Sequence, residues 1–304
     1  MSTLKSNMLL LLAAAIWGFA FVAQRVGMEH VGPFTFNGVR FALGSLSLIP
    51  LILYSGSKPQ QTSHRLKEVS WAGVLAGAVL FSAASLQQIG LIYTTAGKAA
   101  FITCLYIVIV PILGIFLKQY VSTGTWFGCV LAVVGLYLLC VKESFFIAYG
   151  DLLQLGGALF WSVHILLIDY FAQRVDALKL SLFQFITCAV LSLGTAFWLE
   201  TITLDGLTGA LIPILYGGIC SVGIAYTLQV IGQKYSPPSH AALILSMETV
   251  FAAVGGFLIL GEILGLQEII GCVLMLTGML LTQLQSIQSA VQVKVGEEFN
   301  GKGG

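Results

Sequence analysis

An acidic residue, Glu248, lies near the middle of an apolar stretch at residues 238–260. A charged side chain at the centre of a bilayer costs roughly 2.5–3.5 kcal/mol or more, and such residues usually have a function. A carboxylate at that depth could pair with a cationic ligand or take up a proton near neutral pH. A structural hydrogen bond to a neighbouring helix is the alternative. We predict that Glu248 binds a ligand and carries a proton.

Two tryptophans, Trp17 and Trp161, also fall near the middle of apolar stretches, although tryptophan in membrane proteins favours the interfaces. Their rings could stack on a ligand or pack between helices. His164 follows Trp161 by three residues and therefore shares its helical face. It could relay protons, or it could be neutral and bonded to a carbonyl group. We predict ligand binding for all three side chains.

Arg40 lies too deep in its apolar stretch, 32–54, to be a simple loop charge. A guanidinium group there could bind a carboxylate or phosphate group of a ligand. Alternatively, the side chain could extend outward to the membrane surface or form a structural salt bridge. We predict that Arg40 belongs to the same binding site.

Metal, cofactor and nucleic-acid sites find no support in the sequence. The six cysteines form no CxxC pair and lie near no histidine cluster, so we expect ordinary apolar packing and no metal. No GxxxxGK[ST] or GxGxxG loop follows a strand, and we expect no cofactor. A net charge of +1 gives no reason to expect a nucleic-acid partner. The expected partners are a small-molecule substrate and membrane lipid.

The composition places these residues in a membrane protein. Of 304 residues, 58% are hydrophobic and 9% are charged, whereas a soluble chain is about one quarter charged. A membrane-spanning helix needs about 20 mainly apolar residues. Continuous apolar runs also exclude the alternating pattern of a β-barrel. We therefore predict an all-α membrane protein of ten transmembrane helices, at residues 7–27, 32–54, 69–89, 95–117, 124–141, 149–169, 180–199, 208–231, 238–260 and 265–284.

The positive charges orient these helices. If the amino terminus is cytoplasmic, ten of the 14 Lys and Arg residues fall on the cytoplasmic side, which is the side that they favour. We predict a multi-pass protein of the cell inner (cytoplasmic) membrane with both termini in the cytoplasm. Residues 285–304 are expected to form a polar cytoplasmic tail.

The sequence repeats itself once. LQQIGLIYTTAGKAA, from Leu86, matches LQVIGQKYSPPSHAA, from Leu228, and GCVLAVVGLYLL, from Gly128, matches GCVLMLTGMLL. Trp17 and Trp161 lie at nearly the same offset. We predict two five-helix repeats, at residues 5–141 and 149–284. An odd number of helices inverts the second repeat, as alternating access requires; duplication kept only for packing is the alternative.

The repeat adds one residue to the site and suggests how helices meet. Tyr106 is the repeat equivalent of Glu248, and we predict that it also binds substrate. Gly73 and Gly77 form a GxxxG pair, and Gly128 and Gly135 are seven residues apart. Such glycines allow close helix packing inside a chain or in a homodimer.

Several segments resemble the EamA-type members of the drug/metabolite transporter superfamily over nearly the whole chain. They include the early Trp17 and Trp161, TTAGKAAFITCLYIVIVPIL (Thr94 to Leu113) and SMETVFAAVGGFLILGEIL (Ser246 to Leu264). Thr249 stands where proline is common in the family, so the bending of that helix is left open. The resemblance implies a ten-helix exporter or facilitator of metabolites, amino acids or toxic compounds.

We therefore predict a secondary transporter that exports small metabolites, either amino-acid-like compounds or drugs, by alternating access, with proton coupling at Glu248. The predicted substrate-binding residues are Trp17, Arg40, Tyr106, Trp161, His164 and Glu248. The alternative is an intramembrane enzyme acting on a lipid or lipid-linked substrate. It would need paired acids, a metal cluster or a nucleophile beside a base, and no spacing groups Glu248, His164 and Asp169 in that way. We therefore expect that the protein is not an enzyme.

Overall fold

The computed structural model describes residues 3–55, 66–93, 96–119, 121–140, 149–260 and 265–282. All regular elements within those ranges are helical, which confirms the predicted all-helical class. Seven helices in them are long and apolar enough to cross a membrane: Thr3–Gly27, Pro33–Tyr54, Leu66–Tyr93, Ala99–Phe116, Tyr149–Ala172, Ala177–Leu199 and Leu211–Gln233. The polar tail predicted at 285–304 lies outside the described residues.

The helices follow one another along the chain with short connections. In order they are α1 (Thr3–Gly27), α2 (Pro33–Ser55), α3 (Leu66–Tyr93), α4 (Ala96–Cys104), α5 (Tyr106–Phe116), α6 (Thr123–Cys140), α7 (Tyr149–Ala172), α8 (Ala177–Leu199), α9 (Leu204–Gly209), α10 (Leu211–Leu215), η1 (Tyr216–Tyr226), α11 (Thr227–Gln233), α12 (Pro238–Leu245), α13 (Glu248–Leu260) and the helix Leu266–Thr282.

Three of the ten predicted spans are not among those seven. Two of them, at 124–141 and 265–284, coincide with the shorter apolar segments Thr123–Leu138, within α6, and Leu266–Thr282. A helix of 17 residues is about 26 Å long, against a hydrocarbon core of about 30 Å. The third, 238–260, is divided between α12 and α13. The number of ten helices therefore stays a prediction.

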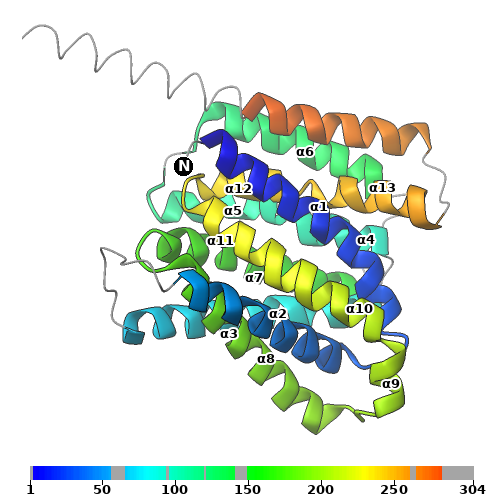
Figure 1. Cartoon of the computed structure of the whole chain (residues 1–304). Helices are drawn as coiled ribbons and strands as arrows, with labels where there is room; N and C mark the ends of the chain where they lie inside the picture. Colours follow the sequence, from blue (N-terminus) through cyan, green and yellow to red (C-terminus); the bar gives the residue numbers. More distant parts are fainter. Residues whose placement is uncertain are drawn as a thin grey trace, which may run out of the picture.

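Small residues bring helices together inside the protein. In Figure 1, α6 and the orange-red helix Leu266–Thr282 run side by side along one edge of the bundle. A Cβ atom on Gly128 would lie 2.9 Å from the carbonyl oxygen of Gly278, and one on Gly77 would lie 2.6 Å from that of Gln184. Only glycine allows backbones to approach so closely. The predicted packing role of these glycines is confirmed within the chain.

One end of the bundle is marked by Glu200, the residue that follows α8. Its carboxylate accepts hydrogen bonds from the backbone N–H groups of Phe34 (2.8 Å) and Thr35 (2.7 Å) and from Thr35 Oγ1 (2.7 Å). The beginning of α2 and the end of α8 therefore lie at the same end, which we call the Glu200 end. Because Gly27 closely precedes α2, α1 ends there too.

The opposite end is marked by Ser6. Its hydroxyl donates a 2.6 Å hydrogen bond to the carbonyl oxygen of Gly232, so the beginning of α1 packs against the end of α11. We call this the Ser6 end. Leu10, one turn after Ser6, and Val230, two residues before Gly232, are fully buried. Gln233 Nε2 also donates to the carbonyl oxygen of Ile165 on α7 (2.9 Å). The bundle is tightly packed at this end.

Two helical segments are interrupted at corresponding places. The chain leaves the α-helix at Leu105, between α4 and α5, and at Ser246 and Met247, between α12 and α13. At the second break, the hydroxyl groups of Ser246 and Thr249 donate to the carbonyl oxygens three residues earlier, at 2.8 Å and 2.9 Å. Such bonds compete with the regular helix. The helix is thus interrupted here without the proline that is common in the family.

Candidate functional site

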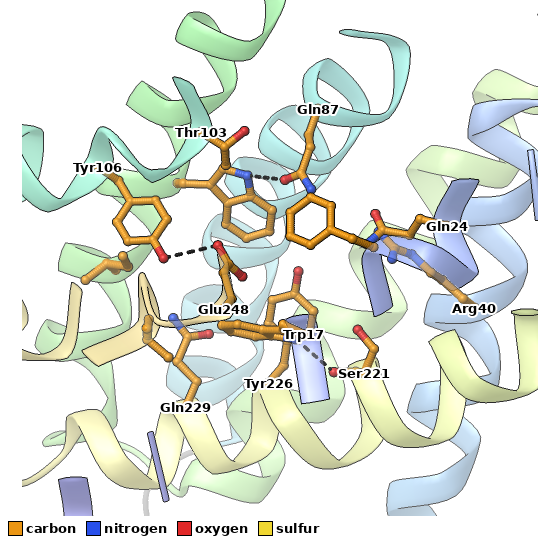
Figure 2. A pocket seen from close by; sticks show the side chains of 14 residues that line it. Trp17, Gln24, Arg40, Gln87, Thr103, Tyr106, Ser221, Tyr226, Gln229 and Glu248 are labelled. Atoms are coloured by element: carbon orange, nitrogen blue, oxygen red, sulfur yellow. Dashed lines mark hydrogen bonds between the residues drawn. The ribbon is translucent and has the colours of Figure 1, made fainter. Parts of the chain in front are cut away.

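A cavity lies between the helices, near both breaks. Its empty volume is about 530 Å³, part of which is open to the outside. Its wall combines aromatic rings with amides, hydroxyl groups and two charged side chains (Figure 2). The lining residues are Trp17, Phe21, Gln24, Arg40, Gln87, Thr103, Tyr106, Trp161, Ile165, Ser221, Tyr226, Gln229, Leu245 and Glu248.

The two interrupted segments meet at Glu248 and Tyr106, which are the first residues of α13 and α5. The Tyr106 hydroxyl donates a 3.2 Å hydrogen bond to Glu248 Oε1, and Cys104 Sγ donates to the same oxygen at 3.4 Å. Glu248 is only 7% exposed, and no lysine or arginine among the described residues forms a salt bridge with it. Its second oxygen, Oε2, accepts none of these bonds. This oxygen is therefore the one available to a ligand.

Three aromatic rings form one wall of the cavity. The ring centroids of Trp17 and Tyr226 are 4.6 Å apart, and Trp161 stacks on Tyr226 at 6.1 Å with an interplanar angle of 19°. Both indole N–H groups are engaged: Trp17 donates to the carbonyl oxygen of Ser221 (3.3 Å) and Trp161 to Gln87 Oε1 (2.8 Å). Because these bonds fix the rings, the wall presents preorganised flat surfaces on which an apolar or cationic group can stack.

Tyr226 owes its position to an unusual helix. It ends η1, an 11-residue π-helix with the sequence YGGICSVGIAY. π-helical segments are rare and often occur at functional sites. Tyr226 is 5% exposed and contacts rings from α1, α2, α7 and α8. Sequence reasoning missed it, because its neighbours read as an ordinary apolar span.

Arg40 lies at another part of the wall, beside Gln24 in Figure 2. It is 3% exposed, and its guanidinium carbon lies 5.5 Å from the ring centroid of Phe36 and 5.2 Å from that of Phe41. Its Nε atom has no hydrogen-bond partner within the described residues, and none of their carboxylates forms a salt bridge with it. The positive charge is thus held by aromatic faces and remains available to an anion.

A polar network behind the wall supports Trp161. Gln87, which accepts from the indole, also accepts through its backbone carbonyl a 2.9 Å hydrogen bond from Gln154 Nε2. Gln154 Oε1 in turn accepts from the hydroxyl group of Thr103 (2.9 Å). Gln154 is fully buried, so these bonds replace the water that its amide loses. The network ties α3, α4 and α7 together around the cavity.

The structure brings five of the six predicted site residues into the cavity wall: Trp17, Arg40, Tyr106, Trp161 and Glu248. His164 is not among the lining residues. It is fully buried behind the wall, edge-on to Trp161 at 6.0 Å and to Tyr226 at 6.4 Å, and its Nε2 lies 2.9 Å from Gln184 Oε1. Ligand binding by each of the six remains a prediction.

Most of the wall consists of positions that correspond in the two halves of the sequence. Trp17 and Trp161 are 144 residues apart, and Tyr106 and Glu248 are 142 apart. The offsets of the internal repeat add three further lining pairs, Phe21 with Ile165, Gln87 with Gln229 and Thr103 with Leu245. The repeat alignment could therefore have identified these residues. Gln24, Arg40, Ser221 and Tyr226 line the cavity without such a counterpart.

The chain is similar to known proteins along nearly its whole length. Residues 4–141 and 148–284 each match the EamA-like transporter family. An uncharacterized transporter of Archaeoglobus fulgidus is 31% identical over 282 residues, which cover 91% of this chain and 85% of that protein. The uncharacterized transporter YvbV of Bacillus subtilis is 24% identical over 305 residues, 97% of each chain. A crystal structure of a protein 19% identical in sequence shares the fold with a TM-score of 0.79, covering 94% of this chain and 99% of that one.

Proposed function

The chain belongs to the EamA-like transporter family and is a multi-pass membrane protein, and we propose that it is a secondary transporter of small metabolites that works by alternating access. The observation that carries this proposal is the cavity between the interrupted helices, which is walled by corresponding residues of the two halves. Secondary transporters commonly bind their cargo at such a place, between repeats and beside discontinuous helices.

In this proposal the chain crosses the cytoplasmic membrane ten times, as two inverted five-helix repeats with both termini in the cytoplasm. The tight packing at the Ser6 end and the position of Gln24 and Arg40 in the wall support a conformation in which the cavity faces the Glu200 end. With a cytoplasmic amino terminus, the Glu200 end is the outer end. Alternating access then requires a second conformation that opens toward the Ser6 end.

The cargo is a small molecule with polar and apolar parts, such as an amino-acid-like compound or an amphipathic drug. Arg40 binds its anionic group, because the guanidinium is buried and no carboxylate of the described residues pairs with it. The rings of Trp17, Trp161 and Tyr226 hold its apolar part. Glu248 binds a cationic group or a proton through the oxygen that Tyr106 leaves available.

Export is driven by exchange of the cargo for a proton at Glu248. One charge moved across 100 mV is worth roughly 2.3 kcal/mol, and about 1.4 kcal/mol changes a concentration ratio tenfold. A single coupled proton therefore sustains a gradient of roughly fortyfold. Glu248 suits this exchange because it is buried, lies in the cavity wall and has no ion-pair partner within the part of the chain that the structure describes.

The family and its transporter-named relatives point to transport and away from the enzyme alternative. The geometry agrees with that choice. Glu248 lies in the cavity wall, His164 lies behind it, and Asp169 accepts a hydrogen bond from Gln173 on the exposed side of α7. These three candidate catalytic groups are thus not gathered around one reacting atom.

Efflux from proteoliposomes tests the proposal. Vesicles are loaded with a pooled metabolite extract, and the retained compounds are measured by mass spectrometry with and without a pH gradient. Wild type and the control Asp205→Asn, which changes an exposed carboxylate in α9, are expected to release one compound class selectively. Glu248→Gln is expected to release none. Retention of every compound by folded wild-type protein, both with this pool and with a pool of amphipathic drugs, would overturn the proposal.

A further inference from the structure

A pair of polar side chains lies buried beside the cavity. His164 on α7 and Gln184 on α8 are both fully buried, and they share one hydrogen bond between His164 Nε2 and Gln184 Oε1. His164 Nδ1 and Gln184 Nε2 have no hydrogen-bond partner within the described residues. An unsatisfied buried polar atom costs roughly 1–3 kcal/mol. Two such atoms in one pair call for a ligand or water in another conformation of the protein.

The position of Gln184 corresponds to that of Arg40. Gln184 is the eighth residue of α8 and Arg40 the eighth of α2, and they are 144 residues apart, the same offset as Trp17 and Trp161. Since α2 begins at the Glu200 end and α8 ends there, Arg40 lies toward the Glu200 end and Gln184 toward the Ser6 end. The two residues thus occupy equivalent positions in the two halves, displaced toward opposite ends of the bundle.

The surroundings of the two residues are also related. Arg40 shares its side of the cavity with Gln24 of α1, and Gln184 is bonded to His164 of α7, which corresponds to α1 in the repeat. His164 lies edge-on to Trp161 and Tyr226, so these two rings separate the buried pair from the present cavity.

We propose that His164 and Gln184 form the second half of the cargo site, which lines the cavity when the protein opens toward the Ser6 end. There they bind the group of the cargo that Arg40 binds in the present conformation. That group is a carboxylate or a similar anionic oxygen group, because a guanidinium group, the amide N–H groups of Gln184 and an imidazole N–H released from Gln184 Oε1 all donate hydrogen bonds to it. The inference rests on the proposed function, since inverted repeats exchange the surroundings of equivalent residues.

Accessibility of single introduced cysteines tests this inference without knowledge of the cargo. Arg40→Cys, Gln184→Cys and, as a matched control, Ala189→Cys on α8 are reconstituted in vesicles and treated from one side with membrane-impermeant sulfonatoethyl methanethiosulfonate. Labelling is measured peptide by peptide, so that the fully buried native Cys188 serves as an internal control on the same helix. Ala189 is a small buried residue, and its replacement by cysteine changes little volume.

We expect Arg40→Cys to be labelled only from the Glu200 end and Gln184→Cys only from the Ser6 end, with Ala189→Cys unlabelled from both. Gln184→Cys that stays unlabelled from both ends, in vesicles where Arg40→Cys reacts, would overturn the inference. If Gln184→Cys does not fold, His164→Cys is measured in its place with the same two outcomes. Labelling from opposite ends without metabolite efflux would overturn the proposed cargo and leave only the exposure of the pair toward the Ser6 end standing. Efflux without labelling of the pair would overturn the inference alone.

Discussion

The two halves of the chain build the same framework and place different chemistry on it. Each half contributes an interrupted helix, a tryptophan and a glutamine to the cavity wall. At the break, however, the first half has Tyr106 and the second Glu248, and eight residues into the second helix the first half has Arg40 and the second Gln184. Duplication thus supplies the shape of the cavity, and the substitutions between equivalent positions supply its charges.

The largest effect is expected from the pair at the breaks. Glu248→Gln should reduce efflux in the proteoliposome assay to background, since no other described acid lines the cavity. Tyr106→Phe removes one hydrogen bond to a charged group, worth about 1.5–3 kcal/mol, and should slow efflux roughly 10- to 100-fold. Both initial rates are measured in folded protein of equal amount. An equal loss of efflux rate in the two variants would contradict the assignment of the main role to Glu248 and a supporting role to Tyr106.

The next effect concerns the charge at Arg40. Arg40→Gln makes this position like its counterpart Gln184 and should raise the apparent KM of the exported compound roughly 10- to 100-fold, because it removes hydrogen bonds to an anion. Arg40→Lys keeps the charge and should lose less. As a check independent of the cargo, Gln24→Cys should react faster with an anionic than with a cationic methanethiosulfonate reagent. If Gln24→Cys still reacts faster with the anionic reagent when Arg40→Gln is also present, Arg40 does not attract anions to the cavity.

A smaller effect is expected from the aromatic wall. Trp17→Ala and Trp161→Ala should each weaken the apparent affinity about 2- to 10-fold, as aromatic contacts contribute roughly 0.5–1.5 kcal/mol beyond the buried area. Trp161 is held by Gln87, whereas Trp17 bonds only to a backbone carbonyl. Gln87→Leu should therefore reproduce part of the Trp161→Ala effect. Unchanged apparent affinity in both tryptophan variants would show that these rings only pack between helices and do not bind the cargo.

The smallest effect is expected from the residues that cap the beginning of the second helix in each half, α2 and α8. α8 begins with its own cap, Asp176, whose side chain accepts from the N–H group of Lys179 (2.9 Å), whereas α2 is capped by Glu200 of the other half. Loss of a charged cap costs about 0.5–2 kcal/mol. Glu200→Gln should lower the melting temperature in detergent by a few degrees. Asp176→Ala removes the cap that α8 receives from its own half and should lower the melting temperature by a similar amount. No change from Glu200→Gln would exclude a stabilising contact at the beginning of α2.

Sequence reasoning predicted the framework well because it depends on hydrophobicity. Long apolar runs predicted the helices, and a charged residue inside such a run indicated Glu248 and Arg40, which both line the cavity. Tyr226 was missed because a π-helix has no strong signature among apolar residues. His164 was placed in the site by helical spacing alone, but tertiary packing sets it behind Trp161.

The interruption of the helix at Ser246 and Met247 was also not predicted, because the hydrophobicity pattern does not reveal it. Thr249 was noted only as a missing proline, but its hydroxyl group bonds to the carbonyl oxygen of Ser246 at the break. A side chain that turns back on its own backbone leaves no mark in a hydrophobicity pattern.

The hydrogen bond from Tyr106 to Glu248 couples the binding of a proton or ligand at Glu248 to the relative movement of the two halves. It joins the two halves of the chain at one oxygen atom, which Cys104 also approaches. A proton or a cationic group that binds at the second oxygen, Oε2, lowers the negative charge of the carboxylate. The hydrogen bond from Tyr106 to Oε1 then weakens, so loading the site loosens the junction between the halves. The rate of conformational exchange, and not affinity alone, would then report what the carboxylate holds. An empty transporter would rest with its two halves fastened together.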